Sequence, residues 1–216
     1  MNFLQICQKV QEKSGIQTKI GSVSTPGLGT IETDIIQSVV TAWSDIQTMR
    51  EDWKFMRSEV DLTLTTATTT HTVSSIFSDE DVFASWKEDR FLYLFTVLQY
   101  IPYDRFILID FTTTSEPKTF TINPSNNDLI FNPVDTSYDI TLQYYINIQT
   151  LADNTDIPNL PSRFHHLLVY AALLDVTASI GDLISYQRYS LKYSMMVSQL
   201  MRSELPGKSV RIQPIA

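Results

Sequence analysis

The spacing of apolar residues changes twice along this chain, and that change constrains the fold more than any other feature. Near both ends of the 216-residue chain, apolar residues recur every three or four positions, as in helices with one buried face. Between residues 58 and 150 they alternate with polar residues, as in half-buried strands. The pattern predicts an α+β fold: a helical bundle of about four helices from both chain ends, with a β-rich antiparallel insertion and an extended C-terminal tail.

Two helices are expected in the N-terminal block, residues 1–57. A joint rich in Gly, Ser and Thr at 21–30 separates them, and it is either an ordinary linker or a segment that orders only on assembly. Thr30 or Thr33 would cap the second helix. The expected buried positions are Phe3, Leu4, Cys7 and Val10 in the first helix, and Ile35, Val39, Ala42, Trp43 and Ile46 in the second.

Short strands with turn signals between them are expected in the middle block, residues 58–150. Val60, Leu62 and Leu64 alternate with polar neighbours, and the Thr-rich run that follows also favours strand. The stretch 80–100 fits either a strand or a helix. The other strand candidates are 105–112, 118–124, 128–133 and 138–148. Turns containing Pro, Asn and Asp separate them, so the block predicts an antiparallel meander.

Two more helices are expected in the C-terminal block, residues 151–206. Pro161 stiffens the approach, Ser162 stands at the N-cap position, and Gly181 supplies the turn between the helices. The expected inward faces are Phe164, Leu167, Leu168, Ala171, Leu174, Asp175 and Ala178 in one helix, and Ile184, Tyr189, Tyr193, Met196, Val197, Leu200 and Met201 in the other. Residues 207–216 form a short polar and β-branched tail.

Charge and cysteine content exclude several functional classes. The formal net charge is −8, and no basic stripe of the kind that binds a nucleic-acid backbone is visible. The single cysteine, Cys7, excludes an internal disulfide and a cysteine-based zinc site. The N-terminus does not have the pattern of a signal peptide, and no apolar run approaches the length of a membrane span. We therefore expect a soluble protein made in the cytosol, with no membrane contact.

The sequence Arg-Phe-His-His at 163–166 is the clearest candidate for chemistry. Neighbouring side chains on a helix point about 100° apart, so His165 and His166 cannot hold one metal ion together. The HExxH spacing is absent, and the third histidine, His71, lies in the Thr-rich region. We interpret the pair as residues that pack or form hydrogen bonds at a helix start. We expect no metal site, no cofactor and no catalytic residue.

Carboxylates support the one enzymatic alternative. They cluster at 79–81, at Glu88 and Asp89, and at Asp153 and Asp156. Two carboxylates that converge in a cleft can hydrolyse a glycosidic bond, so a hydrolase is the alternative interpretation. A solvated face is the more common role of such charges. Phosphate-binding motifs and the nucleophile motif GxSxG are absent.

Two longer patterns make the chain resemble a known family. They are W-x-D-I-Q-x-x-R-x-D-W-x-x-M at 43–56 and L-A-x-x-x-D-I-P-x-L-P-x-R-F-H-x-L-L-V-Y-x-A-L at 151–173. Both consist of packing residues and turn prolines. With the order of the blocks, they make nearly the whole chain resemble the head-to-tail adaptor (connector) proteins of tailed bacteriophages, in particular the tail-accessory adaptors of short-tailed phages.

This resemblance implies a non-enzymatic structural protein of the virion. Such adaptors form a homo-oligomeric ring, usually a dodecamer, under the portal protein at the head–tail junction. The ring extends the DNA channel and provides a platform for the next tail component, a nozzle or hub. DNA would pass an acidic lumen without sequence-specific binding. The alternatives are a tail-associated cell-wall (peptidoglycan) hydrolase and a tail-completion protein that binds elsewhere in the tail.

The resemblance also implies roles for particular residues. Family members use C-terminal extensions for docking, and this tail would add a strand to the portal or wedge between its subunits. Its expected portal-binding residues are Val210, Arg211, Ile212 and Ile215. Trp43 and Trp53 are either core or subunit-interface residues. The Thr-rich run is either a solvated sheet face or the platform for the next tail protein.

Overall fold

The fold was described from a computed structural model, which describes residues 1–16, 20–23 and 30–205, without the side chains of Thr30 and Glu80. The chain divides into two compact units. The helical unit consists of Met1–Phe55 and Ile148–Ala216, and the β-rich unit consists of Met56–Asn147. Helices in the first and paired strands in the second confirm the α+β fold class.

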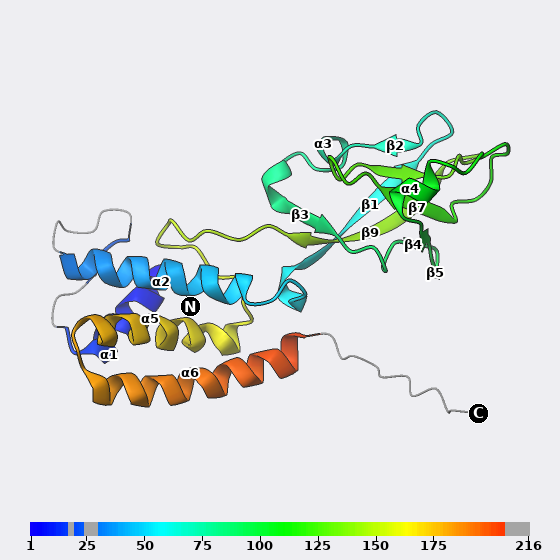
Figure 1. The fold of residues 1–216 in the computed structure, drawn as a ribbon. Coiled ribbons are helices and arrows are strands. Elements are labelled where there is room, and N and C mark those ends of the chain that lie inside the picture. Colours follow the sequence, from blue (N-terminus) through cyan, green and yellow to red (C-terminus); the bar gives the residue numbers. More distant parts are fainter. Residues whose placement is uncertain (17–19, 24–29, 206–216) are drawn as a thin grey trace, which may run out of the picture. The chain divides into compact units, whose positions relative to one another are not determined.

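Four helices of the described residues build the helical unit (Figure 1). They are α1 (Phe3–Ser14), α2 (Thr30–Thr48), α5 (His165–Ser179) and α6 (Leu183–Glu204), and 3₁₀ turns span Lys54–Met56 and Ser162–Phe164. Helix α5 packs against each of the other three, so it forms the centre of the unit. Because α1 and α2 come from one chain end and α5 and α6 from the other, the core forms only when both ends meet.

Local sequence signals set several helix ends. Asn2 and Gln5 form a reciprocal capping box at the start of α1. Gly181, at φ +74°, provides the left-handed turn that was predicted between α5 and α6. The predicted N-caps are wrong: α2 already begins at Thr30, Thr33 lies inside it, and Ser162 lies in a 3₁₀ turn without a side-chain cap.

The predicted inward face holds for α2, but only in part for α5 and α6. Helix α5 is apolar on nearly every side and has three helical neighbours, so periodicity cannot select a single buried face. The residues predicted as buried that are instead half-buried or exposed are Leu4 in α1, Ala171, Leu174, Asp175 and Ala178 in α5, and Tyr193, Met196, Val197 and Met201 in α6. Ile184 in α6 is 83% exposed.

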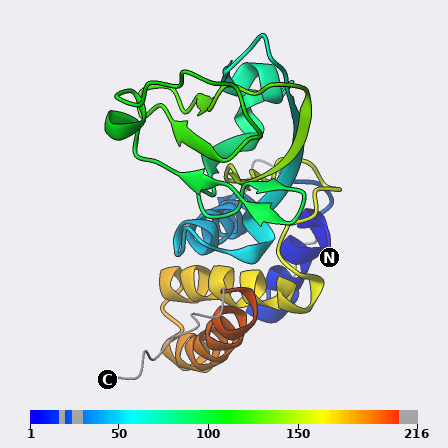
Figure 2. The same ribbon diagram turned by 90° about the vertical axis from the view of Figure 1, so that its right-hand side faces the viewer.

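The β-rich unit contains two small sheets (Figures 1 and 2). The first has the order β1 (Arg57–Leu64), β9 (Tyr138–Ile146), β4 (Leu92–Tyr93) and β5 (Thr96–Val97), with β3 (Phe83–Trp86) also paired to β9. The second has the order β2 (Thr70–His71), β8 (Leu129–Phe131), β7 (Thr119–Ile122) and β6 (Gln99–Tyr100). The short elements α3 (Val73–Ile76), α4 (Tyr103–Phe106) and the 3₁₀ turn Glu80–Val82 connect strands.

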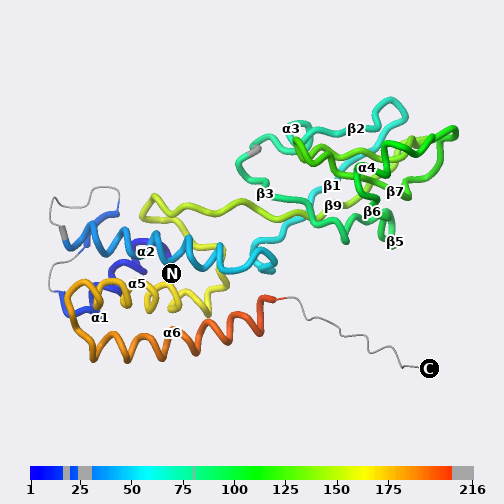
Figure 3. The backbone as a smooth tube through the Cα atoms, viewed as in Figure 1, coloured from blue at the N-terminus to red at the C-terminus, as the bar shows by residue number. Residues whose placement is uncertain are grey.

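Strand pairing differs from the predicted meander. The first long strand, β1, pairs antiparallel with the last, β9, and Arg57 lies opposite Tyr145. The other pairs of named strands are antiparallel except β6 with β7, which are parallel. Figure 3 shows the chain segments of β1 and β9 side by side. Pairing between strands far apart in sequence leaves no local signal. The turn positions alone therefore predicted a meander, in which each strand pairs with the next one along the chain.

Most strand predictions are confirmed, with one clear error. Residues 57–64, 119–122, 129–131 and 138–146 are strands. The expected strand at 105–112 is wrong, because α4 ends at Phe106 and an irregular segment follows. Pro102 precedes this short helix and has no amide hydrogen for a strand ladder. Phe106 alone is buried there, and its ring lies 5.2 Å from that of Phe111.

Candidate interaction surfaces

The two tryptophans singled out in the sequence lie in the core of the helical unit. Trp43 is 1% exposed and Trp53 is 0% exposed. The Trp53 indole Nε1–H donates a hydrogen bond to the Ile46 carbonyl at 2.9 Å, and its ring stacks on Phe55 with centroids 5.4 Å apart. Phe55 also stacks on Trp43, at 6.1 Å. The three rings therefore join the end of α2 to the segment that follows it.

The four expected portal-binding residues, Val210, Arg211, Ile212 and Ile215, lie outside the described residues, as do residues 24–29 of the joint. The Thr-rich run is described, and its side chains are mostly exposed. Within it the chain turns at Thr65 and Thr68, whose hydroxyls lie 3.0 Å apart, before the short strand β2. The run thus forms an exposed turn and one short strand rather than a long sheet face.

Of the histidine pair, His165 is buried at the start of α5, in line with the interpretation as a packing residue, whereas His166 is exposed. The His165 Nε2–H donates to the Leu160 carbonyl at 2.8 Å, and its Nδ1 accepts a hydrogen bond from the Met1 ammonium group at 2.6 Å. Burial lowers the pKa of His165, and the nearby ammonium group lowers it further. The ring is thereby held neutral, as a structural acceptor and donor. Across the described ranges, no three His, Cys, Asp or Glu side chains are grouped to hold a metal ion.

Two of the acidic residues considered for hydrolysis, Asp89 and Asp156, have local structural roles. Asp156 accepts hydrogen bonds from the backbone amides of Ala152 and Asp153, both at 2.8 Å, which lower its pKa. Lys87 pairs with Asp89 and lowers the pKa of that carboxyl group. A general acid needs a raised pKa instead. These two carboxyl groups are thus suited to capping a turn and to an ion pair, not to acid catalysis.

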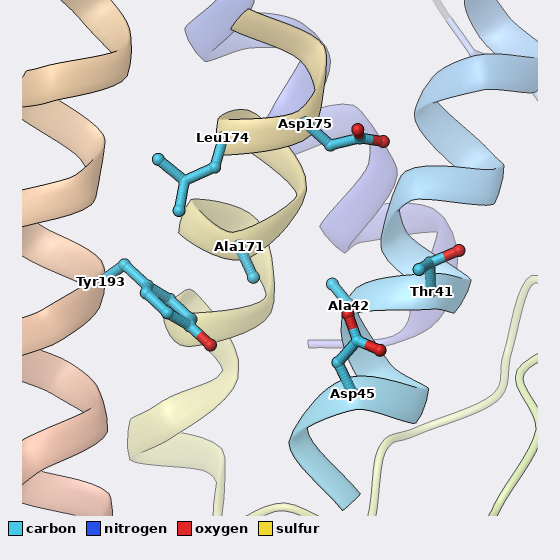
Figure 4. A pocket seen from close by; sticks show the side chains of 7 residues that line it. All are labelled: Thr41, Ala42, Asp45, Ala171, Leu174, Asp175 and Tyr193. Atoms are coloured by element: carbon cyan, nitrogen blue, oxygen red, sulfur yellow. The ribbon is translucent and has the colours of Figure 1, made fainter. Parts of the chain in front are cut away.

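A cleft of about 260 Å³ lies on the helical unit, over α5 and between α2 and α6 (Figure 4). We call it the α5 groove. It is lined by Thr41, Ala42 and Asp45 of α2, Ala171, Leu174 and Asp175 of α5, and Tyr193 of α6. The Asp175 carboxylate accepts a hydrogen bond from the Ser38 hydroxyl at 2.6 Å. Three α5 residues that were predicted to be buried, Ala171, Leu174 and Asp175, therefore form the floor of a groove.

The α5 groove is acidic. Asp45 and Asp175 both line it, and Figure 4 shows Tyr193 reaching from α6 across α5. Burial raises the pKa of Tyr193, and the negative charge of Asp45 raises it further. The Asp45 carboxylate of α2 therefore acts on the Tyr193 hydroxyl of α6, within the same groove. Helix α2 contains Glu32, Asp34 and Asp45 but no Lys or Arg. This one-signed helix is a sequence signal for the acidic character of the groove, but not for its position.

Large exposed apolar side chains gather in three places. On α6 they include Leu191 at 68% and Met195 at 64% exposure. In the β-rich unit they occupy the β4–β5 turn, where Phe95 is fully exposed, and the segment 107–109 after α4. Exposed apolar patches of this kind are common at protein–protein contacts.

The exposed apolar patches are surfaces of the kind that contact other proteins. The comparison with protein families agrees. The model of the family described as SU10 adaptor protein matches residues 1–211, so the chain belongs to this family of bacteriophage adaptor proteins. The family-level resemblance is thus confirmed, and it points to a structural rather than an enzymatic role.

No curated protein matches the chain. Within the described residues, no helix is both long enough and apolar enough to cross a bilayer.

Proposed function

We propose that this chain is the head-to-tail adaptor of a short-tailed phage. Copies of it form a ring, a dodecamer, under the portal protein at the head–tail junction of the virion. The ring extends the DNA channel and carries the next tail component, a nozzle or hub. The observation that carries this proposal is the match of the adaptor family to residues 1–211, nearly the whole chain.

The charge of the chain supports a channel role. Each copy contributes a formal −8. Like charges repel, so a ring of such copies would present DNA phosphates with a surface that does not hold them. DNA would slide through without sequence-specific binding.

The C-terminal tail is the portal-binding element of this proposal. Val210, Ile212 and Ile215 provide apolar contacts and Arg211 a cation, on a segment short enough to add one strand or to wedge between portal subunits. Trp43 and Trp53 then stabilise the subunit rather than contact its neighbours, because both are buried within the helical unit.

The test is to mix the purified chain with assembled portal rings of the same phage and to follow the mass of the complex by native mass spectrometry. We expect a full ring of copies to add to the portal. A chain that ends at Gly207 and the variant Ile212→Asp should bind much more weakly. The variant Gln213→Asp is the matched control, because it adds the same charge one residue away.

Two outcomes would contradict the proposal. If the chain binds isolated tail tubes and not portal rings, it is a tail-completion protein. If full-length chain and truncated chain bind portal equally, the tail is not the docking element even though the adaptor role stands.

A further inference from the structure

The outer face of α6 carries an unusual combination of side chains. Its buried positions include Tyr189 and Leu200. On the opposite side of the helix lie Ile184, Arg188, Leu191, Met195, Ser198 and Arg202, which follow helical spacing. We call these six residues the α6 stripe. Helix α6 also contains no Asp or Glu before its last residue, Glu204, so the stripe is apolar and basic on a chain of net charge −8.

The stripe and the α5 groove complement each other in charge and in polarity. The groove combines the carboxylates Asp45 and Asp175 with the apolar Leu174 and the small Ala171. The stripe offers Arg188 between apolar side chains. Complementary potentials of this kind fix register and favour one partner over others.

The size of the groove favours a side chain as its occupant. Pockets for small molecules usually measure about 300–1,000 Å³. At about 260 Å³, the α5 groove is smaller than that range and suits one or two inserted side chains. A ridge on a helix supplies such side chains at regular spacing.

We infer that one or two side chains of the α6 stripe of one copy insert into the α5 groove of the next copy, with Arg188 and Leu191 at the contact. The contact rests on the ring proposed above and specifies how its copies touch. The stripe faces away from the helix bundle, on the opposite side of α6 from Tyr189, and therefore cannot fill the groove of its own copy. Two different surfaces meeting head to tail form a heterologous contact, which closes into a ring when the rotation allows it.

Disulfide trapping tests this contact in the full-length chain. Thr41→Cys places a thiol on the groove wall, and Leu191→Cys places one on the stripe. In rings assembled on portal, oxidation of the double variant should give a ladder of covalent oligomers on a non-reducing gel. The native Cys7 does not compete, because burial raises its pKa to about 12 and suppresses the reactive thiolate.

The controls separate this inference from the proposed function. Each single variant, and the double variant Thr41→Cys with Glu116→Cys, should give no ladder. Rings that assemble without a ladder in the Thr41/Leu191 variant would overturn the inference and leave the adaptor function intact. Dimers from Leu191→Cys alone would also overturn it, because they indicate stripe-to-stripe contact. If the wild-type chain forms no ring on portal, the proposed function fails, and the contact fails with it.

Charge reversal provides a second test without new covalent bonds. Asp45→Lys and Arg188→Glu should each raise the concentration needed for half-maximal assembly by about tenfold. The double variant should recover most of this loss, because the two charges then attract again. Lys118→Glu makes the same charge change as Arg188→Glu, but on the β-rich unit, and should have no effect on assembly. A double variant weaker than both single variants would contradict the pairing.

Discussion

The helical unit and the β-rich unit bury their cores in different ways. The β-rich unit is one continuous segment whose core combines aliphatic side chains with an aromatic cluster: Phe91 stacks on Phe120 at 4.2 Å, and Trp86 meets Phe91 edge to face. The helical unit is discontinuous, and helices from both chain ends share its core. One unit can therefore gather its core from one stretch of chain, whereas the other must first bring two distant segments together.

The pairing of β1 with β9 connects the folding of the β-rich unit with that of the helical unit. Arg57 near the start of the β-rich unit lies opposite Tyr145 near its end, so folding of this unit brings both of its ends together. The helical unit then closes over a short gap instead of a long flexible loop, which lowers the entropy cost of closure. We expect the β-rich unit to form independently and the helical unit to depend on it.

The largest effect is expected when the units are separated. A fragment of residues 56–147 should fold alone and unfold cooperatively, because it contains a complete core. The separate fragments 1–55 and 148–216 should form no stable bundle, since α5 then loses α1 and α2. Circular dichroism with thermal unfolding measures both. An unfolded 56–147 fragment would contradict the independent folding of the β-rich unit.

Core truncation should cost each unit a similar amount. Trp53→Ala in the helical unit and Phe120→Ala in the β-rich unit each remove a fully buried ring and should each destabilise by about 3–5 kcal/mol. Denaturant unfolding measures the loss. Phe95→Ala is the control, because that ring is fully exposed and its removal should change stability by less than about 0.5 kcal/mol. A large effect at Phe95 in the isolated chain would contradict this assignment.

Acid should weaken the two units through different histidines. Burial lowers the pKa of His165 in the helical unit and of His71 in the β-rich unit below the ordinary 6.5. The unfolded chain then binds protons that the folded chain does not, so stability is full above pH 6.5 and falls as the pH drops below it. His165→Gln should reduce this pH dependence for the helical unit, and His71→Gln for the β-rich unit.

The measurement for this prediction is denaturant unfolding at pH 7.5 and pH 5.5, with near-ultraviolet and far-ultraviolet signals recorded separately. An unchanged pH dependence in both variants would show that neither ring titrates on unfolding.

The smallest effect is expected at the helix turns. Gly181→Ala should cost about 1 kcal/mol, because φ is +74° there and an added Cβ meets no neighbour, leaving only backbone strain. Gly21→Ala is the matched control, with open space around the added Cβ and no left-handed φ, and it should be neutral or slightly stabilising. Thermal unfolding resolves the difference, and equal costs at both glycines would argue against a conformational cause.

Much of the fold was predictable because its signals are local. The alternation of Val60, Leu62 and Leu64 depends on neighbouring residues, and the structure places them in β1. Gly181 marks a turn by its own backbone freedom. The prediction of a strand at 105–112 was wrong, because an apolar run without alternation does not distinguish a strand from an irregular segment.

The candidate surface was less predictable than the fold. Trp43 and Trp53 could be singled out by type, but burial depends on partners such as Ile46 and Phe55. The α5 groove was missed because Ala171 and Leu174 follow an ordinary core pattern. No sequence pattern says that α2 and α6 leave this side of α5 uncovered.

The sequence by itself determined where the long helices and strands form, the acidic charge, and the membership of the chain in an adaptor family. These properties depend on residue type and short spacing. The tertiary structure decided the pairing of β1 with β9, the buried side of α5 and the location of the groove. Each of these requires contacts between segments far apart in the chain, whose free energies no local pattern contains.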